Sequence, residues 1–160
     1  MTLLDELLAA NEAATRPARL DQRPTRRLAV LTCMDARIDV FAVLGLKLGD
    51  AHVVRNAGGR LTDDVLRSLS LSSSVLGVDT VVVMQHTRCG LEGASDAELR
   101  ARTGADLDFL PIDDHEAALR ADIKRLSGTA YLSALRTIAG FVYDVDSGSV
   151  EDVVRWERPG

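Results

Sequence analysis

Residues 28–37 are LAVLTCMDAR, and residues 80–90 are TVVVMQHTRCG. In each stretch a run of aliphatic and β-branched residues, typical of a buried strand, is followed by a short segment that contains a cysteine and polar residues. If both runs are parallel strands of one sheet, their carboxyl ends lie side by side, and Cys33, His86 and Cys89 converge. Two thiolates and an imidazole are ligands that zinc prefers, and three protein ligands with an open fourth position are typical of a catalytic zinc site.

The composition is that of a globular protein of 160 residues, long enough to bury a sizeable core. We expect a single domain over residues 1–160, in which residues 1–26 form an N-terminal helical arm and linker. Hydrophobic residues make up 46% of the chain and charged residues 27%, as in ordinary soluble proteins. The net charge of −5 argues against a nucleic-acid partner, which usually requires a basic face.

Cysteine usage and hydropathy predict the cellular setting. Two cysteines without a secretory signal segment do not indicate a disulfide framework. No apolar run approaches the roughly 20 residues that a membrane span needs. We therefore expect a cytoplasmic protein with no membrane partner, in a reducing compartment that leaves both thiols available for metal.

Segments with strand-like and helix-like patterns alternate along the chain, and the predicted fold class is α/β. The order predicts a mainly parallel sheet flanked by helices. Strands are expected at 27–32, 52–55 and 79–85, a hairpin at 139–155, helices at 3–13, 95–102 and 113–126, a short helical piece around Val40, Phe41 and Leu44, a helix that begins at 62–64 and ends at Gly77, and a linker at 14–26.

Two of these helices carry apolar residues at helical spacing, which predicts a face packed on the sheet. In the helix after residue 62 these residues are Val65, Leu66, Leu69, Val75 and Leu76. In the helix at 113–126 they are Ala117, Leu119, Ile123 and Leu126.

Charged side chains accompany the first cysteine. Asp35 and Arg37 alternate along the loop after Cys33, and alternate positions of an extended segment point the same way. The carboxylate can then reach a metal or its water, while the guanidinium pairs with it in bidentate fashion. The alternative is an ordinary surface ion pair of little energetic value.

The two cysteines also admit a plain interpretation as small buried hydrophobes. Their polar company argues against it, because Asp35, Arg37, His86 and Arg88 would not crowd an apolar core. The glycine-rich residues 56–59 end the second strand at the same edge, where small residues let a substrate or another subunit approach the backbone.

The other two histidines give weaker signals. His52 lies at the start of a predicted strand and His115 in a predicted helix. We expect each to be structural or at the surface rather than a metal ligand, since a lone histidine is a weak indicator. Of the two, His115 is the better candidate for a proton shuttle.

Taken together, three motifs make the chain resemble the β-class carbonic anhydrases. They are Cys33-Met34-Asp35-Ala36-Arg37, Arg55-Asn56-Ala57-Gly58-Gly59 and His86-Thr87-Arg88-Cys89-Gly90. Their order is strongly specific, and the resemblance spans most of residues 25–155. The segment 62–69, TDDVLRSL, and the short chain look like the compact prokaryotic branch of that class.

The resemblance implies a zinc enzyme that hydrates carbon dioxide reversibly to bicarbonate and a proton. It implies one zinc ion per chain on Cys33, His86 and Cys89, with Asp35 and Arg37 orienting the nucleophile and the Gly90 amide donating to a substrate oxygen. It also implies strand order 2-1-3-4 with a fifth strand at the edge, and a homodimer or larger homo-oligomer in which the N-terminal helix lies across the partner.

Two features of the site are less regular. Asp35 is a candidate fourth zinc ligand in a closed state, since relatives of this class show both open and closed sites. Arg88 departs from the family pattern, which usually has aspartate, glycine or another small residue there. Its side chain could compete with Arg37 for Asp35, attract bicarbonate or point to solvent.

Three other functions compete with carbon dioxide hydration. Relatives on this scaffold hydrolyse carbon disulfide or carbonyl sulfide. A non-catalytic regulatory zinc module would have Asp35 permanently in the fourth position. A thiol redox protein using Cys33 and Cys89 is the weakest alternative, because the chain has no Cys-x-x-Cys motif.

Overall fold

A computed structural model describes residues 1–15 and 19–160. Part of the expected linker, residues 16–18, lies outside the described residues. The strands are β1 (Leu28–Cys33), β2 (Ala51–Asn56), β3 (Thr80–His86), β4 (Thr137–Tyr143) and β5 (Val150–Glu157). The helices are α1 (Leu3–Ala13), α2 (Val40–Leu44), α3 (Asp63–Ser74), α4 (Asp96–Thr103) and α5 (His115–Ser127), with short 3-10 turns at Ala57–Gly59 and Ala130–Leu132.

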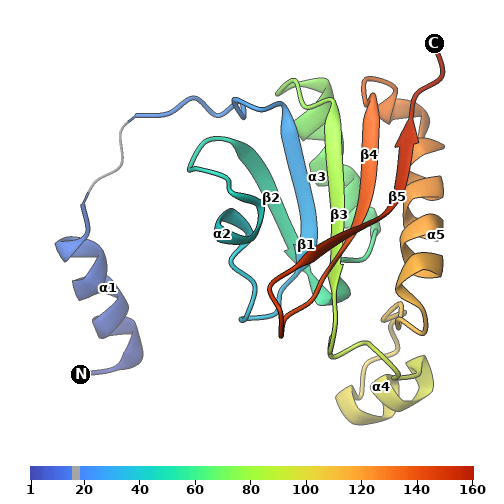
Figure 1. Cartoon of the computed structure of the whole chain (residues 1–160). Helices are drawn as coiled ribbons and strands as arrows, with labels where there is room; N and C mark the ends of the chain where they lie inside the picture. The colour runs from blue at the N-terminus through green and yellow to red at the C-terminus, as the bar shows by residue number, and fades with distance from the viewer. Residues whose placement is uncertain (16–18) are drawn as a thin grey trace.

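The five strands form one sheet in the order β2-β1-β3-β4-β5, which confirms the predicted topology (Figure 1). The β1–β2, β1–β3 and β3–β4 pairs are parallel, and β5 returns antiparallel to β4 as the second arm of the predicted hairpin. In register, Cys33 lies opposite Asn56, and Thr32 opposite Met84. The carboxyl ends of β1, β2 and β3 therefore meet at one edge of the sheet.

Both faces of the central strands are buried, which explains their continuous apolar runs. On one face Leu31 and Val83 pack in a cluster with residues of α3 and α5. On the other face Val30, Val82 and Met84 form a second cluster that includes both cysteines. The metal-ligand candidates thus lie at the end of a close-packed apolar layer.

The first and third predicted strands ended one residue too early. β1 includes Cys33 and β3 includes His86, so both candidate ligands are the last residues of paired strands. At the other end of β1, Arg27 has a φ of 53° and does not belong to the strand. Side chains on strand ends are held more rigidly than side chains on a loop, and this favours a preformed site.

The predicted helical faces were right at Val65, Leu66 and Leu69 and at Leu119, Ile123 and Leu126. The first of these helices ends at Ser74 and not at Gly77, so Leu76 lies beyond it, and two further positions are exposed. Val75 is exposed and follows the last residue of α3, whose buried side includes Ser72 and Ser73 instead. Ala117 is exposed on α5. In each case a rotation of about 100° per residue carries the side chain away from the neighbouring buried leucine, because Val75 is six positions from Leu69 and Ala117 two from Leu119.

The first helix, α1, stands apart from the sheet (Figure 1). It begins with a capping box between Thr2 and Asp5, and none of its residues is buried. Its leucines are all more than half exposed: Leu3, Leu4, Leu7 and Leu8. Among the helices of the described residues, none is long and apolar enough to cross a membrane.

The glycine-rich loop after β2 packs against the backbone of Cys33. Gly59 has a φ of 62°, and a Cβ added there would lie 3.0 Å from the Cys33 nitrogen and 3.0 Å from the Thr32 carbonyl carbon. The sequence suggested that these small residues admit a substrate or another subunit. What approaches Gly59 is instead the end of β1 itself.

This contact predicts that Gly59→Ala destabilises the protein more than Gly45→Ala. Gly45 has a φ of 61° and no atom within 4 Å of the position that a methyl group would take, so its variant carries only the backbone penalty of about 1–2 kcal/mol. Gly59→Ala adds a clash with main-chain atoms that cannot move without displacing Cys33. Urea unfolding of both variants measures the difference, and equal losses would contradict the close contact at Gly59.

Candidate metal centre

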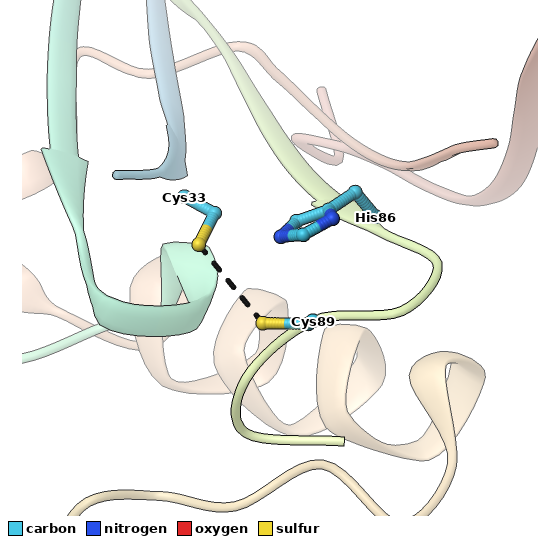
Figure 2. Close-up of side chains that lie close together, drawn as sticks. All are labelled: Cys33, His86 and Cys89. Atoms are coloured by element: carbon cyan, nitrogen blue, oxygen red, sulfur yellow. Dashed lines mark hydrogen bonds between the residues drawn. The ribbon is translucent and has the colours of Figure 1, made fainter. Parts of the chain in front are cut away.

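Cys33, His86 and Cys89 converge as the sequence predicted (Figure 2). Their candidate ligand atoms all lie within 4.8 Å of one another, and all three residues are buried. β1 and β3 supply Cys33 and His86 from adjacent strand ends, and the turn after β3 brings Cys89 back beneath them. Figure 2 shows both sulfurs on the side of the imidazole that faces away from its backbone.

The spacing of the two sulfurs fits a shared metal ion. They are 3.9 Å apart, and both cysteines are free. A disulfide would need about 2.05 Å. Two sulfurs each about 2.3 Å from one tetrahedral zinc ion would be roughly 3.8 Å apart.

The His86 imidazole is oriented to serve as the third metal ligand. His86 Nδ1 donates to the Thr87 carbonyl at 2.9 Å, so Nε2 keeps its lone pair. This Nε2 is buried and has no hydrogen-bond partner among the described residues. An orphaned nitrogen is costly unless something binds it. The donor set therefore fits zinc.

Burial also sets the protonation of the metal-free site. It raises the pKa of the Cys89 thiol to about 11 and lowers the pKa of the His86 imidazole. Both shifts favour neutral groups, and a bound dication would reverse the effect on the Cys89 thiol by stabilising its thiolate. The Gly58 N–H donates to the other sulfur, Cys33 Sγ, at 3.3 Å.

Asp35 and Arg37 form the predicted bidentate pair beside the three ligands. Arg37 Nε donates to Asp35 Oδ1 at 2.9 Å and Nη2 to Oδ2 at 2.7 Å, while Asp35 Oδ2 is 3.8 Å from His86 Nε2. The hydrogen bonds from Arg37 hold the pKa of the Asp35 carboxyl well below its usual range. Asp35 is thus an ionised acceptor at neutral pH, and its place against His86 sets it apart from an ordinary surface pair.

Arg55 is a further part of the site, to which the sequence alone assigned no role. Its guanidinium donates to the carbonyl of Cys33 at the end of β1 at 2.9 Å, and to two carbonyls of the loop that follows, Asp35 at 2.7 Å and Ile38 at 3.1 Å. It therefore fixes the loop on which Asp35 and Arg37 stand. The sequence signals were its place at the end of a predicted strand and at the start of the motif Arg55-Asn56-Ala57-Gly58-Gly59.

A cavity of about 640 Å³ opens onto the two cysteines of the candidate site. Both cysteines, Asp35, Arg37 and Gly90 line it, so the residue predicted to offer its amide to a substrate lies on the wall. Leu91, Leu99 and Phe109 make much of the remaining wall apolar. Such a lining suits a small apolar molecule that must reach a charged centre.

Arg88 does not compete for Asp35. Its Nη1 binds both carboxylate oxygens of Asp146, in the turn between β4 and β5, at 2.6 and 2.9 Å. The carbonyl of Arg88 accepts from Arg37 Nη2 at 3.0 Å. With a φ of 56°, Arg88 occupies a backbone conformation that glycine or aspartate adopts more readily, in agreement with the family pattern.

The remaining histidines lie in different settings. His52 is structural, with Nδ1 2.7 Å from Ser72 Oγ and Nε2 2.8 Å from the Gln22 carbonyl. His115 begins α5 and contacts Gln85, the residue before His86.

Comparisons with known proteins identify the family of the chain. The family model described as carbonic anhydrase matches residues 28–121. Beta-carbonic anhydrase 1 of Mycobacterium tuberculosis is 35% identical over 161 residues, covering 96% of this chain and 99% of that protein. The crystal structure of carbonic anhydrase from Streptococcus mutans has 42% sequence identity and a TM-score of 0.86, with 96% and 99% of the two chains covered.

The chain belongs to the carbonic anhydrase family, and these matches place it with the β class. A more distant branch is also related. The carbon disulfide hydrolase of Saccharolobus solfataricus is 42% identical over 98 residues, which cover 59% of this chain and 48% of that protein.

We expect Cys33→Ser, His86→Ala and Cys89→Ser each to lose stoichiometric zinc. Removing one ligand leaves only two of the converging donors, and the hydroxyl of serine is a poor substitute for a thiolate. Elemental analysis of the purified variants checks this, with His52→Ala as a control for histidine loss away from the site. Full zinc content in any of the three ligand variants would contradict the assignment.

Proposed function

We propose that the chain catalyses the zinc-dependent, reversible hydration of carbon dioxide to bicarbonate and a proton. The observation that carries this proposal is the convergence of Cys33, His86 and Cys89 beside an Asp35 carboxylate that Arg37 holds in place. A zinc ion held by the three ligands would supply a Lewis acid that makes water nucleophilic near neutral pH.

Asp35 supplies the acceptor for the nucleophile. Because its pKa is held below the usual range, the carboxylate remains ionised at neutral and mildly acidic pH and can only accept hydrogen bonds. It takes a hydrogen bond from the attacking oxygen and so aims a lone pair at the substrate carbon. Arg37 keeps both carboxylate oxygens in a fixed orientation.

The cavity wall supplies the substrate's surroundings. Its apolar side chains accommodate carbon dioxide, which carries no net charge. The Gly90 amide is the proposed donor to the oxygen that gains charge as bicarbonate forms. The closed state, in which Asp35 takes the fourth zinc position, stays a prediction from the family resemblance.

We expect the wild-type protein to hydrate carbon dioxide, more actively at mildly alkaline than at mildly acidic pH. Asp35→Ala and Arg37→Ala should keep zinc and lose hydration activity, about 100-fold or more for Asp35, because they remove the oriented acceptor without removing a ligand. Stopped-flow hydration assays at two pH values, beside zinc analysis, measure both effects. Near-wild-type turnover in either variant would show that Asp35 and Arg37 form only a surface ion pair without a catalytic role.

The same assay separates the alternatives. Hydrolysis of carbon disulfide or carbonyl sulfide is the second candidate function, supported by the carbon disulfide hydrolase relatives. Sulfide release from either substrate without carbon dioxide hydration would favour it. Stoichiometric zinc with no turnover of any of these substrates would instead favour a non-catalytic zinc module.

We further propose a cytoplasmic homodimer or larger homo-oligomer with no nucleic-acid or membrane partner. The net charge of −5 supports the first exclusion. The four exposed leucines of α1 support self-association. They form an apolar stripe that no other part of the described chain buries, and a second copy that covered this stripe would stabilise it.

Deletion of residues 1–13 should therefore yield a monomer or an insoluble protein. The truncation removes the helix that would lie across the partner and exposes the surface it covers. Light scattering on the full-length and truncated proteins measures the assembly. A truncated protein with the mass of the intact assembly would show that α1 is not its main contact.

A further inference from the structure

Three polar side chains outside the ligand set surround the metal-binding turn His86–Cys89. Gln85 immediately precedes His86 and is fully buried, Glu92 follows Cys89 by three residues, and His115 is the first residue of α5. Carbon dioxide hydration as proposed uses none of them.

Their contacts connect the two ends of that turn. His115 Nδ1 donates to Gln85 Oε1 at 2.8 Å, and His115 Nε2 lies 3.6 Å from Glu92 Oε1. The other carboxylate oxygen of Glu92 accepts the Cys89 N–H at 3.3 Å. The path therefore runs from the residue before one ligand, through α5, to the backbone of another.

The helix gives this path a rigid base. α5 buries Leu119, Ile123 and Leu126 in the cluster that covers one face of the sheet. A side chain on its first turn can fix a neighbouring loop only because the helix itself is firmly packed.

Burial of these groups is costly, which argues for a role. Gln85 Nε2 and His115 Nε2 are both buried without a hydrogen bond among the described residues. Apolar residues could fill the same space without leaving polar atoms unsatisfied. Groups retained at this cost, next to a ligand pair, indicate that their geometry is used.

We propose that His115 is a positioning residue of the metal centre, acting through Glu92 on the Cys89 amide and through Gln85 on the end of β3. It holds the His86–Cys89 turn from both sides, so that imidazole and thiolate are placed before metal binds. This inference rests on the proposed zinc site. It assigns His115 an anchoring role in place of proton transfer to solvent.

The test is the zinc dissociation constant, measured by competition with a chromogenic chelator. Outer partners of metal ligands typically change metal affinity about 10–100-fold, and we expect losses in that range for His115→Ala and for Glu92→Ala. If His115 acts through Glu92, the double variant should lose less affinity than the sum of the losses in the two single variants. If His115→Ala does not fold, Glu92→Ala still tests the proposal. The Glu92 side chain is 40% exposed, so its removal leaves no buried cavity and the variant should fold.

A conservative variant and a matched control complete the design. Glu92→Gln should lose less zinc affinity than Glu92→Ala, since its amide oxygen can still accept the Cys89 N–H. His52→Ala removes a hydrogen-bonded histidine away from the site and should leave the affinity within about twofold.

The outcomes distinguish this inference from the proposed function. Wild-type zinc binding with unchanged affinity in the His115 and Glu92 variants would overturn the positioning role alone. Losses that simply add in the double variant would show that His115 does not act through Glu92 and would overturn it too. A wild-type protein that binds no zinc would overturn both proposals.

Discussion

The parallel pairing of β1 with β3 is the constraint on which the site depends. Thr32 lies opposite Met84, so β1 and β3 reach the sheet edge together, and Cys33, one residue further on, lies close to His86, two residues further on. Residues 53 positions apart in the chain become neighbours because their strands pair directly. The short turn after His86 then suffices to bring Cys89 beneath them.

Close packing keeps that edge in place. The apolar layers on both faces leave the central strands little freedom, and the glycine-rich loop after β2 locks against the Cys33 backbone. Arg55 donates to carbonyls at the end of β1 and in the loop after it, and so fixes that loop. Arg37, on the same loop, orients Asp35. The sheet thus positions the loop after β1, and this loop positions the side chains of Asp35 and Arg37.

Electrostatics gives the packed site its chemical character. Burial raises the pKa of the Cys89 thiol, so without a cation this ligand disfavours the thiolate form that binds metal best. Asp35 is different, because its hydrogen bonds with Arg37 keep the carboxylate charged beside the buried imidazole. One pocket wall thus combines an ionised acceptor with apolar side chains, a combination suited to an uncharged substrate that gains charge as it reacts.

The sequence by itself determined the fold class, the strand order expected from the family resemblance, and the residues that form the metal centre. Continuous apolar runs and the residue types at the strand ends carry that information locally. Tertiary structure decided what depends on contacts between distant segments. Three such contacts leave no periodic or compositional trace in the sequence, since each partner comes from elsewhere in the chain. They are the hydrogen bonds of Arg55 with three carbonyls, the ion pair of Arg88 with Asp146, and the contacts of His115 with Gln85 and Glu92. Helix rotation likewise exposed Val75 and Ala117, because the angle at which a helix packs on its sheet is set by the whole interface and not by one residue.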